Sequence, residues 1–258
     1  MPDTDNLFYF SNDAGKVSRP PVVFLHGAGG THLHWPPQAR RLLGQRIFAP
    51  DLPGHGRSSG AGRQSIGEYA RDVERFLVDA GLNSAILVGH SMGSAIALTL
   101  ALDFPKRVLA LCLVGSGARL RVAPQILEGT ASEATFPAAV KLVNDFAFGP
   151  STAPRLKELA AQRMAETRPS VLHGDFAACN EFEAMARLGE ITVPTLLVCG
   201  AEDKLTPVKY SEYLRDHIAG ARLVTIPDAG HMVMLEQSEA FSSVLAEFIN
   251  SIPYRPGQ

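Results

Sequence analysis

Short runs of consecutive apolar residues recur along the chain, and most of them end at a glycine or a loop. The runs occupy residues 22–25, 46–49, 85–88, 108–114, 195–199 and 222–226. Within them apolar and polar residues do not alternate. Strands with that pattern are typical of a sheet that is covered on both faces.

Helical patterns lie between these runs, over residues 66–80, 94–102, 207–218 and 234–249. In the first of them Tyr69, Val73, Phe76 and Leu77 fall on one face, and Gly81 follows as a stop signal. Because strand and helix patterns alternate, we expect an α/β fold with a mostly parallel sheet and helices on both faces.

The alternation stops between residues 118 and 188. This stretch holds several prolines and short helical patterns, but it has no clear strand pattern. We therefore expect a helical cap at 118–188, inserted in a core made of residues 1–117 and 189–258. Apolar cap residues such as Phe146 and Phe176 suggest an apolar pocket. Four basic residues of this stretch are open to two interpretations: they bind a substrate carboxylate, or they lie on a solvated helix face. They are Arg119, Arg121, Lys141 and Arg168.

Composition narrows the class of protein further. The chain has 258 residues, 46 % of them hydrophobic, and a net charge of −2, so it offers no basic field for nucleic acid or for a membrane surface. Its longest apolar run is far shorter than a bilayer span, and its N-terminus does not read as a signal peptide. With three scattered cysteines, a cytoplasmic protein is expected.

The strongest chemical motif is Gly89-His90-Ser91-Met92-Gly93, which matches G-x-S-x-G. It follows one predicted strand and precedes a predicted helix. A sharp turn between the two lifts the serine above the sheet, and glycines on each side leave room for it. This context predicts that Ser91 is a nucleophile.

A serine hydroxyl needs a base to remove its proton. His231 follows the last predicted strand and is the candidate base. Asp203 follows the strand before it and is the candidate acid that orients the histidine. Glu202 and Asp228 are weaker alternatives for the acid. The chain order serine, aspartate, histidine is the one known for a G-x-S-x-G elbow on an α/β sheet.

With these motifs the sequence resembles the α/β-hydrolase superfamily over nearly its whole length. The segment 26–30, His-Gly-Ala-Gly-Gly, is similar to the family's oxyanion-hole loop, and 51–58 is similar to the turn after its next strand. The resemblance implies a sheet of the eight-stranded type. It also implies an oxyanion hole formed by the N–H groups of Ala28 and Met92, with Gly29 as a lesser rival to Ala28.

The best-supported function is a carboxylesterase for small apolar esters, acting through an acyl enzyme. Alternatives on the same triad are a carbon–carbon hydrolase, a lactonase, a thioesterase or a perhydrolase; a non-catalytic ligand-binding protein is less favoured. Carbon–carbon hydrolases of this family typically have tryptophan after the catalytic histidine and asparagine before the serine, where this chain has Met232 and His90.

No cofactor or metal is expected. The spacing of His26, His32, His34 and His55 matches no closed zinc pattern. His26 and Asp51 are expected to brace the loops around the site. The expected partner is a small ester-like substrate, and the chain is expected to act as a monomer or homodimer.

Overall fold

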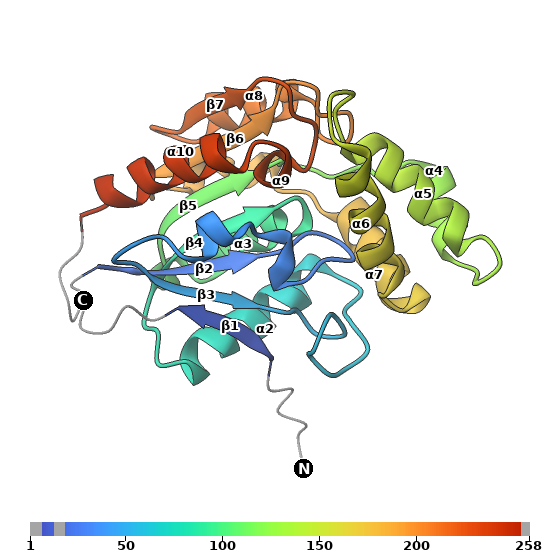
Figure 1. Cartoon of the computed structure of the whole chain (residues 1–258). Helices are drawn as coiled ribbons and strands as arrows, with labels where there is room; N and C mark the ends of the chain where they lie inside the picture. Colours follow the sequence, from blue (N-terminus) through green and yellow to red (C-terminus); the bar gives the residue numbers. More distant parts are fainter. Residues whose placement is uncertain (1–6, 13–18, 254–258) are drawn as a thin grey trace, which may run out of the picture.

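The computed structural model describes residues 7–12 and 19–253, and in them seven strands form one sheet (Figure 1). The strands are β1 Tyr9–Asn12, β2 Pro21–Leu25, β3 Arg46–Pro50, β4 Ala85–His90, β5 Val108–Val114, β6 Thr195–Gly200 and β7 Arg222–Ile226. Their order across the sheet is β1-β3-β2-β4-β5-β6-β7. The strand β1 pairs antiparallel with β3, and every other neighbouring pair is parallel.

The predicted mostly parallel sheet is thus confirmed, and all six predicted strands are present. The described residues contribute seven strands rather than eight. The strand β1 was not among the predicted strands, although it begins within the short apolar run Leu7 to Phe10. It is a four-residue strand at the sheet edge, and its side chains are alternately exposed and half-buried.

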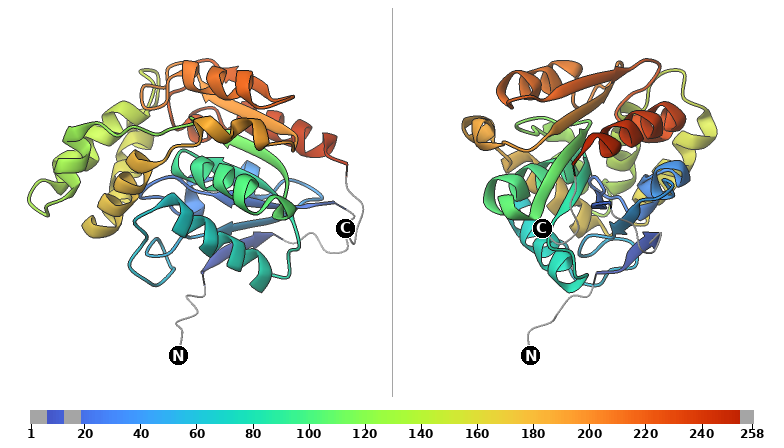
Figure 2. Two further views of the ribbon diagram at one scale, coloured as in Figure 1. Left: turned by 180° about the vertical axis from the view of Figure 1, so that it is seen from behind. Right: turned by 90° about the vertical axis from the view of Figure 1, so that its left-hand side faces the viewer.

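Helices cover both faces of the sheet (Figure 2). On one face lie α2 Ile66–Asp79, α3 Met92–Asp103 and α8 Val208–His217, and on the other lie α1 Pro37–Arg40, α9 Val233–Glu236 and α10 Ser238–Ser251. The predicted helix over 234–249 is therefore two helices, interrupted at Gln237, whose φ of −126° and ψ of 56° are not helical. None of the described helices is long and apolar enough to cross a membrane.

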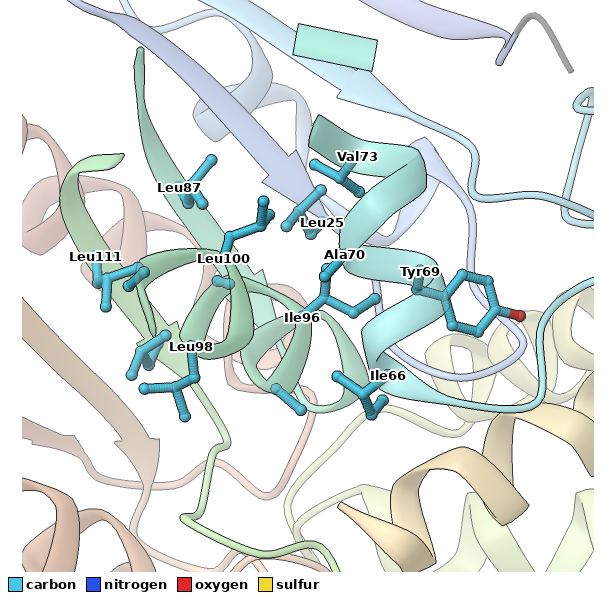
Figure 3. Packing of buried hydrophobic residues seen from close by; sticks show 14 of the residues in the cluster. Leu25, Ile66, Tyr69, Ala70, Val73, Leu87, Ile96, Leu98, Leu100 and Leu111 are labelled. Carbon is cyan, nitrogen blue, oxygen red and sulfur yellow. The ribbon is translucent and has the colours of Figure 1, made fainter. Parts of the chain in front are cut away.

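The alternation of side chains along each strand explains the two layers. In β2, Val23 and Leu25 join the cluster under α2 and α3, whereas Val22 and Phe24 join the opposite cluster under α1 and α10. Figure 3 shows the first cluster, where α2 and α3 side chains meet strand leucines. Since both faces of β2 are buried, all of its residues, Pro21–Leu25, are apolar.

Four α-helices lie between β5 and β6: α4 Pro124–Thr130, α5 Phe136–Ala147, α6 Pro154–Ala165 and α7 Pro169–Glu181, followed by the 3-10 helix η3 Met185–Glu190. We call residues 118–188 the cap. Each of the four helices has a proline in its first turn, where the missing N–H costs nothing. In Figure 1 they form a group beside the ends of the central strands.

Candidate active site

Ser91 lies on a strained turn at the centre of the sheet. It joins β4 to α3 with φ 53° and ψ −115°, and its N–H donates to the Val114 carbonyl at 2.9 Å. A non-glycine residue with positive φ is strained, as expected for a nucleophile elbow. The flanking glycines are required by space: a Cβ on Gly89 would lie 2.2 Å from the Gly93 carbonyl oxygen, and one on Gly93 would lie 2.0 Å from that of Leu25.

The predicted base and acid form a buried pair. His231, after β7, donates from Nδ1 to Oδ2 of Asp203, after β6, across 2.9 Å. The other carboxylate oxygen accepts the N–H groups of Leu205 and Thr206 at 2.9 and 2.8 Å. Burial alone would raise the pKa of Asp203, but the imidazole and the Thr206 donors outweigh it and lower the pKa. Asp203 is therefore ionised and keeps Nδ1 protonated.

The two alternative acids are less well placed. Asp228 is exposed, and Oε2 of Glu202 is buried without a hydrogen-bond partner among the described residues. The backbone just after β5 lies close to the pair formed by His231 and Asp203. A Cβ on Gly115 would lie 3.0 Å from His231 Nδ1 and 3.4 Å from Asp203 Oδ2. Glycine at that position therefore admits the pair.

Ser91 and His231 line one cavity of about 220 Å³ together with Ala28. Most of its wall is apolar and comes from the cap, as the pattern of cap residues suggested. Arg121 and Lys204 also line it. The cap contributes Leu120, Val122, Ala123, Ile126, Val143, Phe146, Phe176 and Cys179.

The backbone around Ala28 and Met92 is compatible with the predicted oxyanion hole. Within the described part of the chain, neither N–H has a protein acceptor. Met92 begins α3, where N–H groups are free and the helix dipole is positive. The N–H of Gly29, the lesser rival, already donates to Asp175 Oδ2 at 2.9 Å. Ala28 is thus the better donor.

His26 and Asp51 brace the loops, as predicted. The His26 ring donates from Nδ1 to the Gly27 carbonyl at 2.8 Å and accepts the Leu52 N–H at 3.0 Å, so it ties the oxyanion loop to the loop after β3. Asp51 accepts from the ring and N–H of His32 at 2.8 and 2.7 Å, and from the N–H of Arg57 at 3.0 Å. In the described residues no three His, Cys, Asp or Glu side chains form a metal-binding group.

Two further residues of the site escaped the sequence analysis. The Thr206 hydroxyl donates to Asp203 Oδ2 at 2.8 Å and lies 3.1 Å from His231 Nδ1. Glu236 accepts the N–H of Gly230 at 2.9 Å and that of Gly149 in the cap at 2.8 Å. Thr206 had a local signal, since it follows Asp203 by three residues as a turn partner does. Glu236 had none, because Gly149 lies 87 residues away and the contact with Gly230, six residues before it, follows no turn or capping pattern.

Comparison with known proteins agrees with the fold. Residues 20–238 match a family model described as "alpha/beta hydrolase fold". The chain belongs to this family and is a hydrolase of it. It is 32% identical to a pimeloyl-[acyl-carrier protein] methyl ester esterase of Neisseria meningitidis serogroup C, over 90% of this chain and 94% of that protein.

Two other relatives mark the range of chemistry. A 2-hydroxy-6-oxo-6-phenylhexa-2,4-dienoate hydrolase of Burkholderia cepacia is 28% identical, with 93% of this chain and 82% of that protein covered. The solved structure of a thermophilic esterase is 36% identical and superposes with a TM-score of 0.81, covering 95% of this chain and 98% of that one.

Proposed function

We propose that this hydrolase is a carboxylesterase that cleaves small apolar carboxylic esters through an acyl enzyme on Ser91. The observation that carries the proposal is the shared cavity. A strained serine and a histidine held by a buried aspartate line the same mostly apolar space. Similarity to esterases over nearly the whole chain supports the choice of ester as the bond cleaved.

The contacts suggest a sequence of steps. With Nδ1 donating to Asp203, the free Nε2 of His231 takes the proton of Ser91 as Oγ attacks the ester carbonyl. The N–H groups of Ala28 and Met92 stabilise the oxyanion. His231 then gives the proton to the leaving alcohol. Water, activated by the same imidazole, releases the acid and restores the serine.

Carbon–carbon hydrolysis is the second candidate, because one relative carries that activity in its name. The residues beside the triad argue against it. His90 occupies the position before the serine, and its Nε2 is engaged with the His231 carbonyl at 3.1 Å. Lactone, thioester and perester substrates stay open on the same triad. A cytoplasmic location and a monomeric or dimeric state likewise stay predictions.

A panel of p-nitrophenyl esters from acetate to octanoate, run beside a dienoate ketone, tests the proposal. We expect turnover of the short esters, and a fall on the order of 10⁴-fold or more in kcat for Ser91→Ala with an unchanged melting temperature. Rapid cleavage of the ketone with slow cleavage of every ester would overturn the ester assignment.

A further inference from the structure

Gly29, in the middle of the oxyanion loop, is held on both of its backbone groups by the cap. Its N–H donates to Asp175 Oδ2 of α7 at 2.9 Å, and its carbonyl accepts the Thr167 hydroxyl, just before α7, at 3.2 Å. Its φ is 62°, and a Cβ there would lie 2.8 Å from the Leu172 side chain. The oxyanion loop is therefore in direct contact with the cap at Gly29, the residue next to Ala28.

Asp175 carries more than this one contact. The carboxylate is completely buried and also accepts from His55 Nε2 at 2.7 Å and from the Tyr69 hydroxyl at 2.6 Å. Figure 3 shows the Tyr69 oxygen at the far end of its ring, pointing away from the leucine cluster. One cap side chain thus connects the oxyanion loop, the turn after β3 and α2.

His55 supplies the opposite charge. Its Nε2 faces the Asp175 carboxylate, and its Nδ1 lies 3.1 Å from the Pro53 carbonyl oxygen. Both neighbours are acceptors, and this arrangement favours a ring that is protonated on both nitrogens. Burial would lower the pKa of His55, but the aspartate outweighs it and raises the pKa. A buried carboxylate without such a partner would be costly, and its charge would oppose an oxyanion nearby.

We propose that the cap is a working part of the oxyanion hole, with Asp175 as the positioning residue that holds Gly29 and thereby aims the Ala28 N–H at the cavity of Ser91. The proposal rests on the proposed function for the role of Ala28. Because the N–H of Gly29 is already bound to Asp175, it cannot rotate to donate to the oxyanion in place of the Ala28 N–H. The same contact holds the preceding peptide group, which carries the Ala28 N–H, in one orientation. Because α7 also brings Phe176 and Cys179 to the cavity wall, one helix sets both the acyl pocket and the hole.

The test compares three variants in the full-length protein. Asp175→Asn removes the negative charge. It also replaces one carboxylate oxygen, which accepts a hydrogen bond, with an NH₂ group, which donates one. Thr167→Val removes only the hydroxyl on the Gly29 carbonyl. Tyr69→Phe is the matched control, because it removes a donor to the same carboxylate from the side away from the loop. For each, kcat and KM on a p-nitrophenyl ester, the rate of Ser91 labelling by a fluorophosphonate, and the melting temperature are measured.

An oxyanion hole acts on the transition state and not on substrate binding. We expect Asp175→Asn to lower kcat and the labelling rate by about 10- to 100-fold with KM within about two-fold. Thr167→Val should lower both rates several-fold in the same pattern. Tyr69→Phe should lower the melting temperature but leave kcat within about two-fold.

Equal effects of Asp175→Asn and Tyr69→Phe on kcat would overturn the proposal and reduce Asp175 to a structural residue. If Asp175→Asn does not fold, Thr167→Val decides, and wild-type rates in that variant overturn the proposal. Failure of the proposed function looks different: the unaltered protein then fails to cleave esters. The labelling rates still report on the oxyanion loop in that case.

Discussion

The ring of His90 donates from Nε2 to the main-chain carbonyl of His231 across 3.1 Å, so the residue before Ser91 is joined to the loop that carries His231. The two rings are 4.7 Å apart between centroids. The residue before the serine is variable in the G-x-S-x-G motif. In this chain the contact gives that residue, His90, a positioning role. It fixes the distance between the elbow after β4 and the loop after β7, two segments that share no sheet hydrogen bond.

Replacing this donor should therefore affect the reaction more than the binding. We expect His90→Phe to lower kcat by about 10-fold with little change in KM, because small misplacements of a catalytic group are expensive. Steady-state kinetics on a short p-nitrophenyl ester measures this. His217→Phe, at the exposed end of α8, is the control and should behave as the unaltered protein. An unchanged kcat in His90→Phe would contradict this positioning role of His90.

Thr206 should be required for full activity. Its hydroxyl donates to the Asp203 oxygen that also holds His231, and hydrogen bonds to charged groups are worth about 1.5–3 kcal/mol. We expect Thr206→Val to lower kcat by about 10-fold. The matched control is Thr195→Val at the other end of β6, where the buried hydroxyl donates to the Val193 carbonyl at 3.0 Å. If both variants lose the same small amount of activity, the hydroxyl at 206 is merely structural.

Gly93 should tolerate no side chain. A Cβ there would lie 2.0 Å from the backbone oxygen of Leu25, and backbone of a central strand cannot yield cheaply. We expect Gly93→Ala to lower the free energy of unfolding by about 3 kcal/mol or more, as in severe overpacking. Gly189→Ala has open space around it and should stay within about 0.5 kcal/mol. Urea denaturation of both variants provides the comparison, and similar midpoints would contradict the steric account.

Stability should fall as the pH falls from neutral toward 5. Burial, with neighbouring histidines, lowers the pKa of His26 and His90, and lowers that of His34 to about 4. The unfolded chain, with histidine pKa values near about 6.5, then binds more protons than the folded one. Their stabilisation is therefore present above that pH and is lost below it, at up to about 1.4 kcal/mol per pH unit for each ring.

His55 behaves oppositely, because its pKa is raised. Its contribution is complete below the unfolded value and is lost as the pH rises through the folded one. Denaturation midpoints at pH 7 and pH 5 test the balance. Three rings oppose one, so we expect a lower unfolding free energy at pH 5. A higher value at pH 5 would contradict the assignment of the three rings as neutral.

The core strands, and the places of Ser91, Asp203 and His231 after three of them, could be predicted because their signals are local. An unbroken apolar run marks a strand with two covered faces, and G-x-S-x-G after such a run marks the elbow at Ser91. Asp203 and His231 each follow a strand, so the parallel sheet brings them to one edge.

The role of Asp175 could not be predicted, because its partner Gly29 lies 146 residues away and nothing near it in sequence signals the contact. The same holds for Thr167, which is 138 residues from that glycine. Both contacts depend on how the cap packs against the core, and side-chain packing determines that. The periodicity of the sequence predicts the helices of the cap but not where they contact the core.

The most direct test of the account is to look for the acyl group itself. The protein is mixed with p-nitrophenyl butyrate, quenched in acid within the first turnovers, digested and analysed by mass spectrometry. We predict a butyryl group on the peptide that contains Ser91, and its absence in Ser91→Ala and in His231→Ala. Steady ester turnover with that peptide unmodified, or with the acyl group on another side chain, would contradict the assignment.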